Sequence, residues 1–149
     1  MGWFYGFKLH LAVNDRGELL ACCLTPGNVD DRTPVPHLVK RLRGKLFGDR
    51  GYVSAPLTQL LFEQGLQLIT RLRKNMKNHL MSLSDKLLLR KRVIIEAIID
   101  QLKNISQIEH SRHRSPTNFV VHMIAGLIAY SHQEKKPGLH LNELTLLVA

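Results

Sequence analysis

The amino-acid sequence predicts a mixed α/β domain that contains an antiparallel portion. Residues 7–11 alternate between apolar and polar side chains, which is typical of a strand. The turn signal NDRG at 14–17 separates this segment from a second apolar segment, which indicates a hairpin. Further along the chain, short apolar runs alternate with segments that carry helix start and stop signals. The expected order is hairpin, helix, strand, helix, strand, helix, helix.

The N-terminal hairpin is expected to pair WFYGFKLHLAV at 3–13 with ELLACCLT at 18–25. Its first strand places apolar and polar side chains on opposite faces: Phe7, Leu9 and Leu11 against Lys8 and His10. The aromatic residues within 3–7 could form a base-stacking platform, but the alternation favours packing in the core or at the sheet edge.

A short helix and a short strand are expected next. VPHLVKRLRG at 35–44 is predicted to form a helix with Leu38 and Leu42 facing inward and Gly44 closing it. KLF at 45–47 is a candidate for a short buried strand.

The middle of the chain predicts two helices and a strand. SAPLTQLLFEQG at 54–65 has an N-cap Ser, an early Pro and a closing Gly, so it should form a helix. The segment LQLITRLRK that follows should be a strand that runs into a basic region. A long helix capped by Ser84 is expected to continue to about Asn104.

A final helix is expected from about Pro116 to Ser131, followed by a Lys-Lys-Pro-Gly tail that we expect to be loose. The length of the chain suits one domain, which we place at 1–134, with a C-terminal tail at 135–149.

The chain is strongly basic, with 21 Lys and Arg against 12 Asp and Glu and a net charge of +9. This excess predicts an anionic partner, of which nucleic acid is the commonest, although ribosomal and membrane-surface proteins are basic too. The positive charges concentrate within 71–92, where only Asp85 opposes them: Arg71, Arg73, Lys74, Lys77, Lys86, Arg90, Lys91 and Arg92.

The cysteines and the apolar segments indicate a cytoplasmic protein without a membrane span. Cys22 and Cys23 are adjacent, so a strand would point them to opposite faces, and no C-x-x-C spacing suggests zinc or redox chemistry. The apolar run at 119–130 is interrupted by His122 and is too short to span a bilayer. The N-terminus lacks the features of a secretion signal.

The segment RKRVIIEAIIDQLKN at 90–104 carries a glutamate within one of the most apolar runs of the chain. On a helical wheel, Glu96, Asp100 and Lys103 all fall within about 80° of Arg92. Apolar residues fill most of the remaining circumference, so we expect a helix packed on two or three sides. The charged stripe is either a solvated face with an Arg92–Glu96 ion pair or the lining of a cleft.

Asp49 follows the predicted strand at 45–47, and strand ends at the rim of an α/β sheet are where ligand sites gather. It could also be only the first residue of a D-x-G turn. Taken together, Asp49 and Glu96 could hold Mg²⁺, a hard cation that prefers oxygen ligands and supports phosphodiester chemistry. Arg92 and Lys103 would then contact phosphate.

The chain resembles the C-terminal half of a DDE-type bacterial insertion-sequence transposase. The resemblance covers nearly the whole chain and rests on motifs that occur in family order: GWFYGFKLHL, TPGNVDDR, LFGDRGY, LITRLRKNMKN, LSDKLLLRKRVIIEAIIDQLKN and IEHSRHRSPTNF. It implies an RNase H-like mixed sheet flanked by helices. It also implies DNA transposition by Mg²⁺-dependent cleavage of DNA ends and strand transfer, with Mn²⁺ as a possible substitute.

The resemblance assigns roles to individual residues. Asp49 matches the second catalytic Asp and Glu96 the catalytic Glu, both as metal ligands, while Arg92 and Lys103 match the Arg and Lys of a Y-x2-R-x3-E-x6-K signature. Leu89 stands where that signature has Tyr. The DNA and phosphate contacts are expected from the signature cations and the basic segment: Arg92, Lys103, Arg71, Arg73, Lys74, Lys77, Arg90 and Lys91.

The family's first catalytic Asp lies on a strand upstream of the hairpin that begins this chain. We therefore expect 1–134 to be a partial catalytic domain that lacks the first catalytic strand, truncated at its N-terminus and inactive alone. Its expected partners are DNA, as element ends and target, and a second copy or a full-length transposase, with no membrane. The alternative is a non-catalytic DNA-binding remnant that interferes with an intact transposase. Either form would associate with the nucleoid when bound to DNA.

The spacing of His110 and His113 could indicate a zinc site. No Cys lies nearby and Arg112 and Arg114 flank the second histidine, so a basic segment near DNA, or packing around the preceding helix, is favoured.

Overall fold

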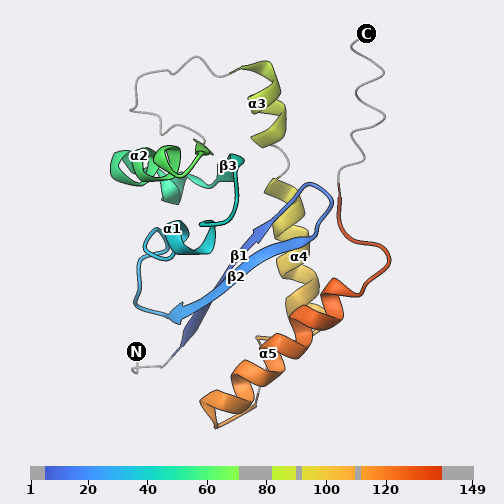
Figure 1. Cartoon of the computed structure of the whole chain (residues 1–149). Coiled ribbons are helices and arrows are strands. Elements are labelled where there is room, and N and C mark those ends of the chain that lie inside the picture. The colour runs from blue at the N-terminus through green and yellow to red at the C-terminus, as the bar shows by residue number, and fades with distance from the viewer. Residues whose placement is uncertain (1–5, 71–81, 90–91, 110–111, 139–149) are drawn as a thin grey trace. The chain divides into compact units, whose positions relative to one another are not determined.

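A computed structural model describes residues 6–70, 82–89, 92–109 and 112–138, except the side chains at 87, 88 and 92 (Figure 1). The chain divides into two compact units. The first comprises residues 1–12 and 20–92, and the second comprises residues 13–19 and 93–149.

The predicted hairpin is confirmed. Strand β1 (Phe7–Val13) pairs with β2 (Leu19–Pro26) in a two-stranded sheet. The side-chain oxygen of Asn14 accepts hydrogen bonds from the backbone N–H groups of Arg16 (3.0 Å) and Glu18 (2.9 Å), which closes the turn. The short turn makes the two strands antiparallel.

Burial along β1 is greatest on the face that carries His10 and Ala12. Phe7, on the opposite face, is 38% exposed. The polar face of this strand is therefore the better covered one, and a hydrogen-bond partner satisfies its histidine, as described below.

Helix α1 (Val35–Leu38) is shorter than the predicted helix over 35–44. Leu38 and Leu42 pack against the core as expected. Gly44, however, does not close the helix: it begins strand β3 with a φ of +103°, and its N–H donates to the carbonyl of Gly65. The prediction was wrong because pairing of the chain with a distant strand ends the helix early.

A β-α-β unit forms the centre of the first unit. Strand β3 (Gly44–Gly48) runs parallel to β4 (Leu66–Thr70), with Gly44 opposite Leu66 and Gly48 opposite Thr70. Helix α2 (Ala55–Glu63) connects them, as parallel strands require a crossover.

The sequence predicted α2 through its ends. The Ser54 hydroxyl accepts a hydrogen bond from the N–H of Leu57, and Gly65 takes a positive φ of +80° where the chain leaves the helix. The core of the first unit lies between α1, α2 and the strands and consists of buried apolar side chains: Ala12, Val35, Val39, Leu57, Leu61 and Leu66.

The long helix predicted to run from Ser84 to Asn104 is instead two helices, α3 (Leu83–Leu88) and α4 (Arg92–Asn104). Ser82, and not Ser84, accepts the hydrogen bond from the backbone N–H of Asp85 at 3.1 Å. The two helices also belong to different units, apart from the first residue of α4.

Helix α5 (Pro116–Ser131) matches the predicted bounds. In the second unit it packs closely on the segment after α4, because a Cβ on Gly126 would lie 2.6 Å from the Cγ2 of Ile108. Within the described segments, no helix combines the length and the apolar character needed to cross a membrane.

Candidate metal and nucleic-acid site

Asp49 lies directly after β3, as predicted, and is exposed. Its Oδ1 accepts a hydrogen bond from the backbone N–H of Gly51 at 2.9 Å and begins the short 3₁₀ helix η1 (Arg50–Tyr52). The D-x-G turn is therefore present. The turn fixes the direction in which the carboxylate leaves the strand, which is compatible with a ligand role as well.

Tyr52 holds this turn against the end of β3. A Cβ on Gly48 would lie 3.4 Å from the Cδ2 of the Tyr52 ring, and the ring packs against the core. Burial raises the pKa of the Tyr52 hydroxyl, and the charges of Asp31 and Asp49 raise it further. The hydroxyl therefore stays protonated and can donate a hydrogen bond near Asp49.

A group of polar residues that the sequence did not single out lies in the same unit. Lys8 Nζ forms an ion pair with Asp31 Oδ1 at 2.9 Å and also donates to the carbonyl of Val29 at 2.9 Å. His10 Nε2 lies 2.8 Å from the Thr25 hydroxyl. Burial lowers the pKa of His10, partly opposed by Asp31. Only the alternation of polar residues in β1 pointed to this group.

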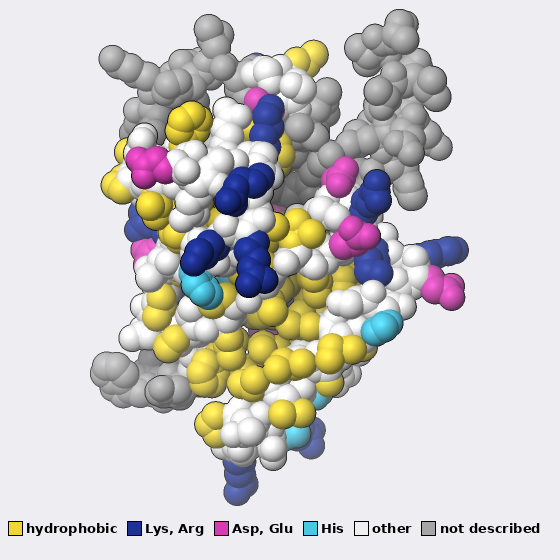
Figure 2. All heavy atoms as spheres, in the orientation of Figure 1, with side chains coloured by type: hydrophobic (Ala, Val, Ile, Leu, Met, Phe, Trp, Pro, Cys, Tyr) yellow, Lys and Arg dark blue, Asp and Glu magenta, His cyan; other side chains and the backbone are white. Residues whose placement is uncertain are grey.

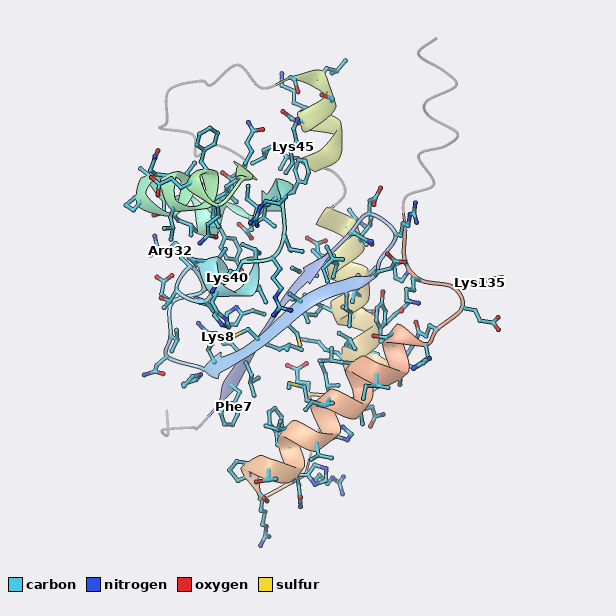
Figure 3. The ribbon with its side chains drawn as sticks, in the orientation of Figure 1. Phe7, Lys8, Arg32, Lys40, Lys45 and Lys135 are labelled. Atoms are coloured by element: carbon cyan, nitrogen blue, oxygen red, sulfur yellow. The ribbon has the colours of Figure 1, made fainter. Side chains whose placement is uncertain are left out.

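Basic side chains gather over α1 and β3 in the view of Figure 2, and Figure 3 labels Lys8, Arg32, Lys40 and Lys45 on that side. Lys40 and the adjacent Arg41 are exposed at the end of α1. The expectation placed the DNA-binding surface in the segment 71–92 and overlooked KRLRGK at 40–45, although its charge density was visible in the sequence.

Glu96 is exposed on α4, as the helical wheel predicted. Ile94, Ile98 and Leu102 are buried on the opposite side of the helix. Val93 and Ile99 are 62% and 40% exposed, so the expected packing on two or three sides is wrong. The charged stripe thus lies in a broad open arc with an apolar residue at each margin.

The other residues of the stripe have local partners where they are described. Lys103 Nζ lies 3.0 Å from Glu109 Oε2, and Asp100 Oδ1 accepts a hydrogen bond from the Asn104 amide at 2.7 Å. The backbone of Arg92 begins α4, but its side chain lies outside the description. Six further cations proposed for DNA contact also fall outside the described residues: Arg71, Arg73, Lys74, Lys77, Arg90 and Lys91.

The histidine pair expected near 110 is described only in part. His113 lies against His122, with ring centroids 5.5 Å apart, and His122 Nε2 is 3.2 Å from the carbonyl of Gln107. His110 is outside the described residues. Within the described part, these histidines contact the helix α5 and the loop before it.

Comparison with known families identifies the chain. The family model described as Transposase DDE domain matches residues 1–116, which include both Asp49 and Glu96. This chain belongs to the transposase DDE domain family. No curated protein and no solved structure gave a significant match. Membership implies an RNase H-like fold and a function related to DNA transposition.

Transposase DDE domains generally use divalent metal ions, and the chemistry of the two matched residues suits one. Both are exposed carboxylates, and carboxylate oxygens are the ligands that Mg²⁺ and Mn²⁺ prefer. Among the described residues, no three His, Cys, Asp or Glu side chains are grouped closely enough to hold a metal ion. Asp49 lies in the first unit and Glu96 in the second.

Proposed function

We infer that this transposase domain supports Mg²⁺-dependent cleavage of DNA at the ends of a mobile element and transfer of the freed 3′-end to target DNA. The observation that carries the proposal is Asp49, which stands at the end of β3 inside the region that matches the family. Glu96, exposed on α4 within the same region, is the second proposed ligand.

Asp49 and Glu96 would hold Mg²⁺, or Mn²⁺ in its place, through their carboxylate oxygens. A divalent ion there would help to activate an attacking oxygen and to stabilise a leaving oxygen. The protein's own contribution is orientation: the Gly51 N–H holds Oδ1 of Asp49, and Tyr52 packs the turn against β3. These contacts limit the rotation of the carboxylate before the metal binds.

DNA is the proposed partner, contacted through its phosphates by the basic segment. Arg71, Arg73, Lys74, Lys77, Arg90 and Lys91 supply the charge, and Arg92 and Lys103 would act closest to Glu96. The net charge of +9 supports this proposal, because phosphate neutralisation dominates the affinity of DNA-binding proteins. We also propose that the chain acts with a second copy or with a full-length transposase and associates with the nucleoid.

The test is cleavage of labelled duplexes taken from DNA that flanks the reading frame, with Mg²⁺ or Mn²⁺. Asp49→Asn and Glu96→Gln should each lower the cleavage rate by orders of magnitude, because carboxylates that share metal ions act as a unit. Asn keeps an Oδ1 that can accept the Gly51 N–H, so the turn should remain.

Asp100→Asn is the matched control, because it removes a carboxylate from the same exposed arc of α4 without changing a proposed ligand. It should cleave like the unsubstituted protein. Cleavage that survives both Asp49→Asn and Glu96→Gln would contradict the metal-site proposal.

A second proposal is DNA binding without cleavage. The resemblance matches Asp49 and Glu96 to two of the family's three acidic positions, and a partial carboxylate set should be slow by orders of magnitude. In that case the 149-residue chain would bind the duplexes, show no metal-stimulated cleavage and inhibit an intact transposase in the same reaction. Cleavage by the chain alone would reject this second proposal.

A further inference from the structure

An ion pair in the first unit joins the strand that leads to Asp49 with helix α3. Lys45 Nζ lies 2.6 Å from Asp85 Oδ1, across a sequence separation of 40 residues. Lys45 belongs to β3, and Figure 3 shows it beside α3. The Asp85 side chain is only 12% exposed, whereas that of Lys45 is 43% exposed.

Asp85 is held by its own helix as well as by Lys45. Its backbone N–H donates to the Ser82 hydroxyl, which in turn lies 2.8 Å from the Ser84 hydroxyl. The hydrogen bond from Lys45 lowers the pKa of Asp85, and Ser82 lowers it further. A nearly buried carboxylate needs such a partner, so displacement of α3 from β3 would leave it poorly compensated.

The position of this pair along the chain gives it a meaning beyond local stability. Helix α3 is the last helix of the first unit, and the chain passes into the second unit between Arg92 and Val93. Glu96 follows within the first turns of α4. The Lys45–Asp85 pair is therefore an anchor between the strand that ends at Asp49 and the segment that leads to Glu96.

We propose that Lys45 and Asp85 are positioning residues for the DNA-cleavage site: by tying α3 to β3 they fix the point from which α4 leaves the first unit, and so restrict where Glu96 can lie relative to Asp49. The proposal rests on the proposed function, because it assumes that the two carboxylates act together. Neither Lys45 nor Asp85 needs to touch the metal or the DNA for this role.

The first test compares Asp85→Asn and Lys45→Gln with the charge-exchanged variant that combines Lys45→Asp and Asp85→Lys. With either single substitution, the cleavage rate at saturating DNA should fall by about a hundredfold, as expected for a small misplacement of catalytic groups. The DNA dissociation constant should not change. The charge exchange should recover much of the rate, which a simple loss of folded protein would not explain.

Asp31→Asn is the matched control, because it removes an exposed Lys–Asp pair of the same unit that does not involve α3. Its cleavage rate should match that of the unsubstituted protein. Far-UV circular dichroism on every variant establishes that the fold is retained. A folded Asp85→Asn or Lys45→Gln that cleaves at the normal rate overturns the positioning role.

The second test does not depend on cleavage, so it separates this proposal from the proposed function. Nitroxide labels at Phe62→Cys on α2 and Ile105→Cys after α4, both exposed positions, are placed in a Cys22→Ser, Cys23→Ser background. Pulsed electron paramagnetic resonance then gives the distribution of label distances in the full chain. Asp85→Asn should broaden the distribution, and the charge exchange should narrow it again.

An unchanged distance distribution in a folded Asp85→Asn overturns the proposal even if cleavage is metal-dependent. A broadened distribution supports it even if the chain alone does not cleave DNA. Failure of the proposed function appears elsewhere, as cleavage that is insensitive to Asp49→Asn and Glu96→Gln.

Discussion

The phenol hydroxyl of Tyr130 donates a hydrogen bond of 2.6 Å to the backbone carbonyl of Gly17, across 113 residues of sequence. Tyr130 lies in the last turn of α5 and is fully buried, and Gly17, at the tip of the hairpin, is buried too. Gly17 has a φ of +75°, which favours glycine. Within the second unit, this contact fixes the hairpin tip on α5.

Tyr130→Phe should lower the free energy of unfolding by about 1–3 kcal/mol, because the substitution leaves the buried Gly17 carbonyl without its donor. Urea unfolding followed by circular dichroism measures the change. Ser131→Ala is the control: it removes a hydroxyl from the next residue, where the partner is only the Leu127 carbonyl of the same helix. The control should have little effect. Equal losses in the two variants would mean that the tip contact contributes nothing specific.

Gly126→Ala should destabilise the second unit although alanine favours helices. The added Cβ would lie 2.6 Å from the Cγ2 of Ile108, so overpacking of about 1–3 kcal/mol should exceed the gain in helix propensity of about 1 kcal/mol. Thermal unfolding of the single variant and of Gly126→Ala with Ile108→Ala tests this. In the double variant, much of the loss due to Gly126→Ala should disappear. Additive effects of the two substitutions would contradict the contact.

His10 should make stability depend on pH near neutrality. Burial lowers its pKa in the folded protein below the value of 6.5 that it has when exposed. The unfolded chain therefore binds the proton more tightly, and the His10 contribution to stability is present above pH 6.5 and lost as the pH falls below it.

Urea unfolding between pH 8 and pH 5 measures this linkage. In His10→Gln the decline of stability toward low pH should be shallower than in the unsubstituted protein. His132→Gln, which changes an exposed histidine after α5, should keep the original slope. A His10→Gln variant with the original slope would show that the histidine is not the group responsible.

Lys74→Gln combined with Lys77→Gln should weaken DNA binding and reduce its salt dependence. If both residues contact phosphate, the slope of log K against log salt should fall by about one unit for each contact removed. Fluorescence anisotropy with a labelled duplex over a range of salt concentrations gives this slope. Lys135→Gln, an exposed lysine of the C-terminal segment, should leave it unchanged (Figure 3). A slope that does not respond to the double substitution would remove these lysines from the DNA contact.

Sequence patterns located the elements whose ends are set by local chemistry. Helix α2 was predicted because Ser54 caps its first turn and Gly65 permits the left-handed turn after it. Helix α5 was predicted from Pro116 and a long apolar stretch, and the hairpin from Asn14 and the alternation around it. Asp49 and Glu96 were singled out in the same way, from a strand end and a helical wheel.

Only the tertiary structure decided the features that depend on residues far apart in the chain. Helix α1 ends early because Gly44 pairs with the strand at 66–70, which no local signal in 35–44 encodes. Lys45 finds Asp85 for the same reason, since the energy of an ion pair depends on proximity in space and on burial, and neither can be read from sequence spacing. The sequence by itself thus determined the secondary structure near its caps and turns and the carboxylates that suit a metal. Long-range packing decided where helices stop and which charges hold them in place.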